Sequence, residues 1–116
     1  MANKYGAKKT PRIVNGETYY FDSSAEAKRY DYLIVLLKAG HISNLSLQPE
    51  FILQDGFSHE GKKYRPVKYT ADFKYIRDGC WHVEEVKGYK TEAYCIRKRL
   101  FLSKFGDKYK FIEITP

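Results

Sequence analysis

The sequence contains few of the residues that build disulfide-rich or zinc-binding folds. Only two cysteines, Cys80 and Cys95, occur in 116 residues, and they form neither a C-x-x-C pair nor a zinc-ligand spacing with histidine. A disulfide framework and a structural zinc site are therefore not indicated, and we expect both thiols to be reduced and buried. The three histidines, His41, His59 and His82, are scattered, so each is expected to be structural or exposed rather than a metal ligand.

Long apolar runs and several common catalytic motifs are also missing. No window approaches the roughly 18 to 20 apolar residues that a membrane helix needs, and the first residues contain no apolar segment of the signal-peptide kind. The motifs G-x-S-x-G and H-E-x-x-H and a phosphate-cradling glycine loop do not occur. These absences predict a cytoplasmic protein with no membrane partner, and they give no support to a serine hydrolase, a zinc protease or an NTPase.

Positive charge and aromatic rings are what the sequence has in excess. There are 21 Lys and Arg against 14 Asp and Glu, a formal net charge of +7, which favours a polyanionic partner such as nucleic acid. A basic protein without such a partner is the alternative. The hydrophobic content of 43% and aromatic content of 16% predict a globular chain, and its length fits one domain.

The N-terminal third predicts a basic arm, a hairpin and a helix. Residues 1–10 are expected to form a mobile basic arm. Asn15-Gly16 lies between short apolar runs, which is typical of a two-residue hairpin turn. Residues 24–39 carry apolar side chains at helical spacing, with a capping residue at 22 or 23 and Gly40 just beyond the end.

The middle of the chain predicts three antiparallel strands. One lies in SLQPEFILQ, from about Pro49, and a second in YRPVKYTADFKYI, separated from the first by the polar turn SHEGK. Asp78-Gly79 then forms a tight turn into CWHVEEVKG, the third strand. We expect the three to pair as a meander.

The last segment predicts a second helix and a returning strand. The helix starts at the cap Thr91 and stops at Gly106, and YKFIEI returns as a parallel strand. Its expected inward residues are Ala93, Ile96, Leu100 and Phe101, with Lys98, Arg99 and Lys104 on other faces. The predicted fold class is α/β, an α-β-β-β-α-β core with a mixed central sheet flanked by two helices, in one domain over residues 11–116.

The run HVEEVKGY places two acids side by side in a predicted strand. Because side chains alternate along a strand, Glu85 and Lys87 share one face, whereas Glu84 points to the other. We therefore expect Glu84 to be a surface acid or one that lies behind a site. Counting outward from the Asp78-Gly79 turn places Asp72 opposite Glu85 on the neighbouring strand.

The repulsion between two carboxylates that lie this close must be compensated by another group. At about 4 Å and an effective dielectric near 20 they repel by roughly 4 kcal/mol, so a shared proton or a divalent cation is required. Oxygen ligands favour Mg²⁺ or Mn²⁺ over zinc. Asp72, Glu85 and Lys87 thus predict a metal site, and an ordinary cross-strand ion pair on a solvated sheet face is the alternative.

The spacing of these residues resembles a known nuclease signature. Asp72, twelve intervening residues and then Glu85-Val86-Lys87 resemble the D…(D/E)-x-K pattern of the PD-(D/E)XK nuclease superfamily, with Ala71 where the superfamily name has proline. Longer stretches resemble a family of small phage endodeoxyribonucleases described as Holliday-junction-resolvase-like. These stretches are KYGAKKT, FDSSAEAKRY, ISNLSLQPEF, YTADFKY and VEEVKGYKTEAY.

The resemblance covers nearly the whole chain and carries several implications. It implies a restriction-endonuclease-like fold, Mg²⁺-dependent hydrolysis of DNA with Mn²⁺ able to substitute, branched DNA as substrate, a homodimer, and the host cytoplasm if the chain is encoded by a phage. Asp72, Glu85 and the carbonyl of Val86 would hold the metal. Lys87 would orient the attacking water or stabilise the transition state.

Two further residues are candidates for this site. Glu26 shares a helical stripe with Leu33 and Leu37 and would complete the metal site directly or through water, although Ser23-x-x-Glu26 also fits a capping box. Gln48 adjoins the site in the resembling family, and a structural hydrogen bond is its alternative role.

Cations outside this cluster are candidate DNA contacts. Lys90 and Thr91 lie near the start of the second helix, where main-chain N–H groups can hold a phosphate, although a plain cap and a solvated lysine explain them equally well. The full set is Lys4, Lys8, Lys9, Lys90, Thr91 and Lys98. A non-catalytic basic DNA-binding module is the rival to the nuclease hypothesis.

Overall fold

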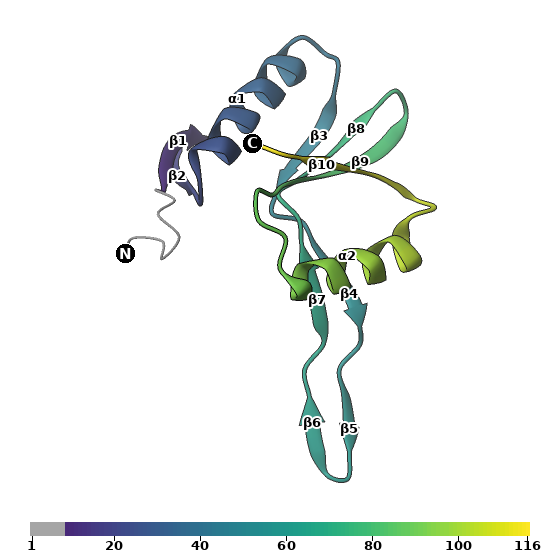
Figure 1. The fold of residues 1–116 in the computed structure, drawn as a ribbon. Coiled ribbons are helices and arrows are strands. Elements are labelled where there is room, and N and C mark those ends of the chain that lie inside the picture. The colour runs from purple at the N-terminus through teal and green to yellow at the C-terminus, as the bar shows by residue number, and fades with distance from the viewer. Residues whose placement is uncertain (1–8) are drawn as a thin grey trace.

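The computed structural model describes residues 9–116, and its helices are α1 (Ser24–Lys38) and α2 (Glu92–Phe105). The strands are β1 (Thr10–Val14), β2 (Glu17–Phe21), β3 (Ser43–Leu47), β4 (Glu50–Gln54), β5 (Phe57–His59), β6 (Lys62–Tyr64), β7 (Val67–Thr70), β8 (Phe73–Arg77), β9 (Cys80–Val86) and β10 (Tyr109–Ile114). A four-stranded mixed sheet has the order β10-β9-β8-β3, with β10 parallel to β9 and the other neighbours antiparallel (Figure 1). The predicted α/β class with a mixed sheet and two helices is confirmed.

Local sequence signals account for the N-terminal hairpin and the first helix. Asn15 and Gly16 both have positive φ, 51° and 82°, as the tight turn between β1 and β2 requires. The Ser23 hydroxyl caps α1 by accepting a hydrogen bond from the Glu26 main-chain N–H, and Gly40, at φ 81°, follows its end. Both predicted elements are confirmed.

The strand predicted from about Pro49 is β4, but the sequence analysis missed β3 and the sharp bend between β3 and β4. A second bend breaks the strand predicted in YRPVKYTADFKYI into β7 and β8. Gln48 has a φ of 50° and Pro49 has no N–H to donate, so β3 ends there and β4 starts in a new direction. Opposite this bend, Ala71 and Asp72 separate β7 from β8. Two main-chain hydrogen bonds tie the two bends together, from Gln48 N to Asp72 O at 2.9 Å and from Ala71 N to Pro49 O at 3.1 Å.

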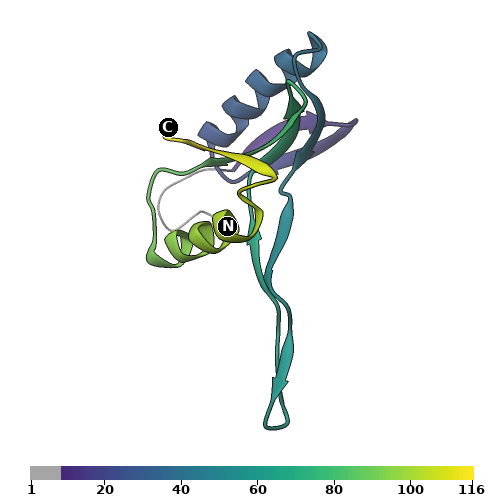
Figure 2. The same cartoon turned by 90° about the vertical axis from the view of Figure 1, so that its right-hand side faces the viewer.

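Beyond the bends the chain forms a long hairpin that projects from the sheet (Figures 1 and 2). β4 pairs with β7 at its root, and β5 pairs with β6 at its tip, so the turn does fall within SHEGK as predicted but the ends of that segment belong to strands. Glu60 and Gly61, at φ 48° and 80°, make the actual two-residue turn.

Hydrophobic side chains fill two clusters on opposite faces of the sheet. Phe73 and Tyr75 of β8 pack with Leu33 on the side of α1, whereas Val83 of β9 packs with Phe101 on the side of α2. This alternation is what the period of a strand requires. The site at the bends therefore lies between two separately packed halves.

The inward face of α2 differs from the prediction. Phe101 is buried as expected, but Ile96, Leu100 and Ala93 are exposed, and Tyr94 is buried instead. The face of α2 that packs on the aromatic rings at the root of the hairpin also carries Phe105 and Lys98. Lys98 lies on this face because it forms an ion pair with Glu113. Its position on the packed face of α2 corrects the prediction that it lies on another face.

Both cysteines are exposed and free, which corrects the expectation of buried thiols. Cys80 directly follows the turn at Gly79, and Cys95 lies on the solvent side of α2, positions that the spacing of the two residues could not reveal. His82 is structural, as one of the two expectations had it. It stacks on Tyr75 and its Nδ1 lies 2.9 Å from the Cys80 carbonyl oxygen. No helix among residues 9–116 is long and apolar enough to cross a membrane.

Candidate functional site

Asp72 and Glu85 meet at the bend between β7 and β8. The register of β8 on β9 pairs Phe73 with Glu84, so the next pair outward is Asp72 with Glu85, as the count from the turn predicted. Asp72 is held to β9 through its main chain and its side chain, because its N–H donates to the Glu84 carbonyl at 3.0 Å and its Oδ2 accepts from Val86 N at 2.6 Å. Only 9% of Asp72 and 4% of Glu85 are exposed.

Two further side chains from different elements contact Glu85. The Tyr69 hydroxyl, from β7, donates to Glu85 Oε1 at 2.5 Å. Lys87 Nζ lies 3.8 Å from Glu85 Oε2, so the predicted sharing of one strand face is confirmed. Lys87 also lies over the ring of Tyr94, with Nζ 4.9 Å from the ring centroid, which holds the lysine beside the acid pair while leaving its end partly exposed.

The acid pair is poorly solvated, and this raises both pKa values. Burial and the neighbouring Asp72 charge raise the pKa of Glu85 to about 8, against the lowering effects of the Tyr69 hydrogen bond and of Lys87. Burial also raises the pKa of Asp72, although the Val86 N–H opposes the shift. The interaction between the two carboxyl groups lowers the pKa of Asp72 and raises that of Glu85, so Glu85 is the weaker acid of the pair.

Glu26 approaches the pair from the first turn of α1. It is nearly buried on the stripe with Leu33, and burial and the charge of Asp72 raise its pKa to about 7. Only the Ser23 half of the capping box is formed, because Glu26 supplies its N–H to Ser23 while its carboxyl group faces the charge of Asp72. No three Asp, Glu, His or Cys side chains within residues 9–116 are grouped closely enough to hold a metal ion unaided. Direct ligation by Glu26 therefore stays a prediction.

Glu84 points to the opposite face, as predicted, but it is not a surface acid. It is completely buried against α1, where the guanidinium of Arg29 donates to both of its oxygens at 2.7 Å and the Tyr75 hydroxyl donates to one of them. A buried carboxylate requires such partners. The two adjacent glutamates thus have separate roles, with Glu84 fastening α1 to β9 and Glu85 belonging to the acid pair.

Glu113 is a neighbour of the site that the sequence analysis missed. It lies beside Glu85 in the parallel register of β10 on β9. It accepts from the Tyr94 hydroxyl at 2.5 Å and pairs with Lys90 at 2.7 Å and with Lys98 at 3.2 Å, and these contacts hold its pKa down at about 2. Its position in an alternating strand was the only signal, and that signal required the register of the strand.

The remaining predicted residues differ in where they lie. Lys90 and Lys98 are bound to Glu113, and the Thr91 hydroxyl accepts from Tyr94 N as the cap of α2. Gln48 is exposed and adjoins the site through its main chain, whose N–H bonds to the Asp72 carbonyl. Lys9 is exposed, and Lys4 and Lys8 lie outside the described residues.

The fold and the site together define an α/β protein with a buried pair of carboxyl groups and a lysine at the bend between β7 and β8. The chain belongs to the family described as "Protein of unknown function (DUF1064)", whose model matches residues 2–115. No curated protein matches the chain.

Proposed function

We propose that the chain is a metal-dependent endodeoxyribonuclease with a restriction-endonuclease-like core. The observation that carries this proposal is the nearly buried pair of Asp72 and Glu85, with Lys87 Nζ 3.8 Å from a Glu85 oxygen. Such a pair is costly to keep in a small domain unless a ligand uses it, because burial and repulsion disfavour its charged form. The resemblance of Asp72…Glu85-Val86-Lys87 to the nuclease signature gives the same reaction class.

The donors at the bend fit a hard divalent cation. Asp72 and Glu85 offer carboxylate oxygens, the Val86 carbonyl is adjacent in sequence, and no soft ligand lies among them. Mg²⁺ is commonly held by one or two carboxylates together with water and substrate phosphate, so a complete protein cage is not needed. A divalent cation bound there supplies Lewis-acid stabilisation of the negative charge that grows on the scissile phosphate.

The protein side chains would then divide the work of hydrolysis. Ionised Asp72 and Glu85 bind the cation, and Tyr69 fixes the orientation of Glu85 through its hydrogen bond. Lys87, partly exposed and carrying a charge, orients the attacking water or neutralises a phosphate oxygen. Glu26, with its raised pKa, is placed to complete the site directly or through water.

DNA is the proposed substrate because the chain carries a formal charge of +7. The resemblance adds specificity for branched DNA. A branched substrate with two-fold symmetry matches a homodimer with two sites on opposite strands, which we include in the proposal.

Cleavage of duplex, single-stranded, flap and four-way-junction DNA, with Mg²⁺, with Mn²⁺ and with chelator, tests the reaction. We expect metal-dependent cutting that falls roughly a hundredfold or more in Asp72→Asn, Glu85→Gln and Lys87→Met, since each removes a group used in the transition state. Glu17→Gln on β2 and Lys38→Met at the end of α1 change the same charges elsewhere and should cut normally. Cutting in chelator, or in all three site variants, would contradict the assignment.

A non-catalytic DNA-binding module is the second candidate, and one observation favours it. Glu85 has a pKa of about 8 without any metal, so the pair can satisfy itself with one shared proton at neutral pH. A protein of this kind binds DNA, with an affinity that falls steeply with salt, but never nicks it with either metal.

A further inference from the structure

The tip of the projecting hairpin has no hydrophobic core to support it. We call residues 54–66, which comprise β5, β6 and their flanks, the arm, and every residue in it is exposed. An isolated two-stranded hairpin is marginally stable in water. Its side chains therefore face solvent from both strands and are available to a partner.

Two aromatic rings form a stacked pair on the arm. Phe57 and Tyr64 lie opposite each other in the β5–β6 register, with ring centroids 4.9 Å apart and planes inclined by 11°. Phe57 is 48% exposed and Tyr64 is 40% exposed, and Lys62 Nζ lies 5.3 Å from the Tyr64 ring centroid. An ordered, solvent-exposed aromatic pair is a surface on which a flat ring can stack.

β6 and the segment that leads from it into β7 carry positive charge, most of it unpaired. Residues 62–68 read KKYRPVK, with four cations and no acid. Lys68 pairs with Glu50, but Lys62, Lys63 and Arg65 form no ion pair within the described chain. Lys62 shares a face of the hairpin with the two rings, and Lys63 projects from the other face of this narrow ribbon. A partner with flat bases can stack on the rings while its phosphate backbone reaches the cations around the edge.

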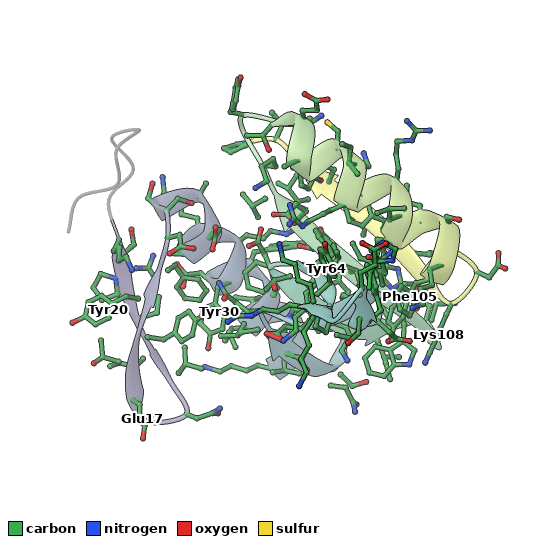
Figure 3. All side chains as sticks on the ribbon, turned by 90° about the horizontal axis from the view of Figure 1, so that it is seen from below. Glu17, Tyr20, Tyr30, Tyr64, Phe105 and Lys108 are labelled. Atoms are coloured by element: carbon green, nitrogen blue, oxygen red, sulfur yellow. The ribbon has the colours of Figure 1, made fainter. Side chains whose placement is uncertain are left out.

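The root of the arm is fixed to the candidate site. Lys104 Nζ bonds the Ile52 carbonyl at 2.9 Å and Arg97 Nε bonds the Lys68 carbonyl at 3.2 Å, so α2 holds both strands. Tyr69, at the end of β7, donates to Glu85. Figure 3 looks along the arm from its tip, with Tyr64 in the middle, Tyr30 on the side of α1, and Phe105 on that of α2.

We propose that the arm binds unpaired bases of nucleic acid, which stack on Phe57 and Tyr64 while Lys62, Lys63 and Arg65 contact the phosphates. The proposal rests on the DNA-binding part of the function proposed above and names the element that recognises non-duplex DNA. The arm is continuous with β7, whose Tyr69 contacts the acid pair, so a strand held on the arm leads toward Asp72 and Glu85.

Fluorescence anisotropy in chelator tests the arm without any cleavage. The probes are labelled oligo(dT) of about 20 nucleotides, a blunt duplex of similar length and the same duplex with a central bulge. We expect Phe57→Ala/Tyr64→Ala to weaken binding of oligo(dT) and the bulged duplex by at least about tenfold, and binding of the blunt duplex by less than about twofold. Phe57→Tyr/Tyr64→Phe keeps both rings and should bind as the wild type does.

The matched controls lie on other elements. Ile13→Ala/Tyr20→Ala removes two exposed side chains from the N-terminal hairpin and should leave all three affinities unchanged. Lys62→Ala/Lys63→Ala should weaken binding to all probes and reduce the salt dependence on oligo(dT) by roughly 1.4 in the log–log slope, whereas Lys38→Ala should not.

The outcomes separate the arm from the nuclease. The arm proposal is wrong if the ring variant binds oligo(dT) like the wild type, if it loses affinity equally on blunt duplex, if polyglutamate displaces oligo(dT) as well as unlabelled oligo(dT) does, or if the wild type binds no probe. If the rings are required for binding but no DNA is cut with Mg²⁺ or Mn²⁺, the arm proposal stands and the nuclease proposal falls. If the ring variant binds as the wild type does and DNA is cut in a metal-dependent way, the nuclease proposal stands and the arm proposal falls.

Discussion

Replacing Glu85 with glutamine removes one ionisable group from the buried carboxyl pair while keeping its shape. The pKa of Glu85 is about 8 in the folded protein against an ordinary value of 4.5, so the folded state binds more protons than the unfolded state between these pH values. The contribution of this group to stability is fully present below pH 4.5 and is lost as the pH rises through 8. The wild type should therefore lose stability on going from pH 6 to pH 9, whereas Glu85→Gln should lose less.

The size of the effect follows from the two pKa values. Between pH 6 and pH 9 ionisation of this carboxyl group stabilises the unfolded state throughout but the folded state only above pH 8, a difference of about 3 kcal/mol. For a domain of this size that corresponds to a fall in melting temperature of about 10 °C.

Urea denaturation in chelator at pH 6 and pH 9 measures this difference. Glu17→Gln removes the same charge from an exposed position on β2 and is the matched control. Added Mg²⁺ at pH 9 should stabilise the wild type and have little effect on Glu85→Gln. The reasoning fails if Glu85→Gln and the wild type lose stability in parallel between the two pH values, because the carboxyl pair would then be well solvated.

Arg29→Met should cost about 3 to 5 kcal/mol in unfolding free energy by urea titration, because it leaves buried Glu84 without its ion-pair partner. Arg12→Met, which breaks an exposed pair with Asp31, should change stability little, and equal losses in the two variants would contradict the view that burial of Glu84 matters. Both exposed thiols, Cys80 and Cys95, should react with a thiol reagent in the folded protein at rates close to those in urea. Protection of either one would mean that it is covered.

Local signals carried most of what the sequence predicted correctly. The Asp78-Gly79 turn fixes the register of β8 on β9, and strand alternation then places Asp72, Glu85 and Lys87 together. The register and the alternation of side chains both depend on residues that are close together in the chain. The same reasoning separated Glu84 from Glu85 by face.

The features that were missed depend on contacts between distant segments. Glu84 is buried because Arg29, 55 positions away, reaches it from α1. The inward face of α2 is chosen by the rings at the root of the hairpin, and its own sequence offers apolar residues on more than one side. Glu113 becomes a neighbour of Glu85 only through the register of two parallel strands.

Because Glu84 and Glu85 are adjacent, their roles depend on the exact register of β9 in the sheet. A slip by one position would leave a carboxyl group with only one of their two partners, Tyr69 or Arg29, and would place Val83 or Val86 before the other. Lys87 would then face α1, and the amine would be lost from the acid pair. The two-residue turn at Asp78 and Gly79 therefore fixes the register that directs Glu84 to Arg29 and Glu85 to the acid pair.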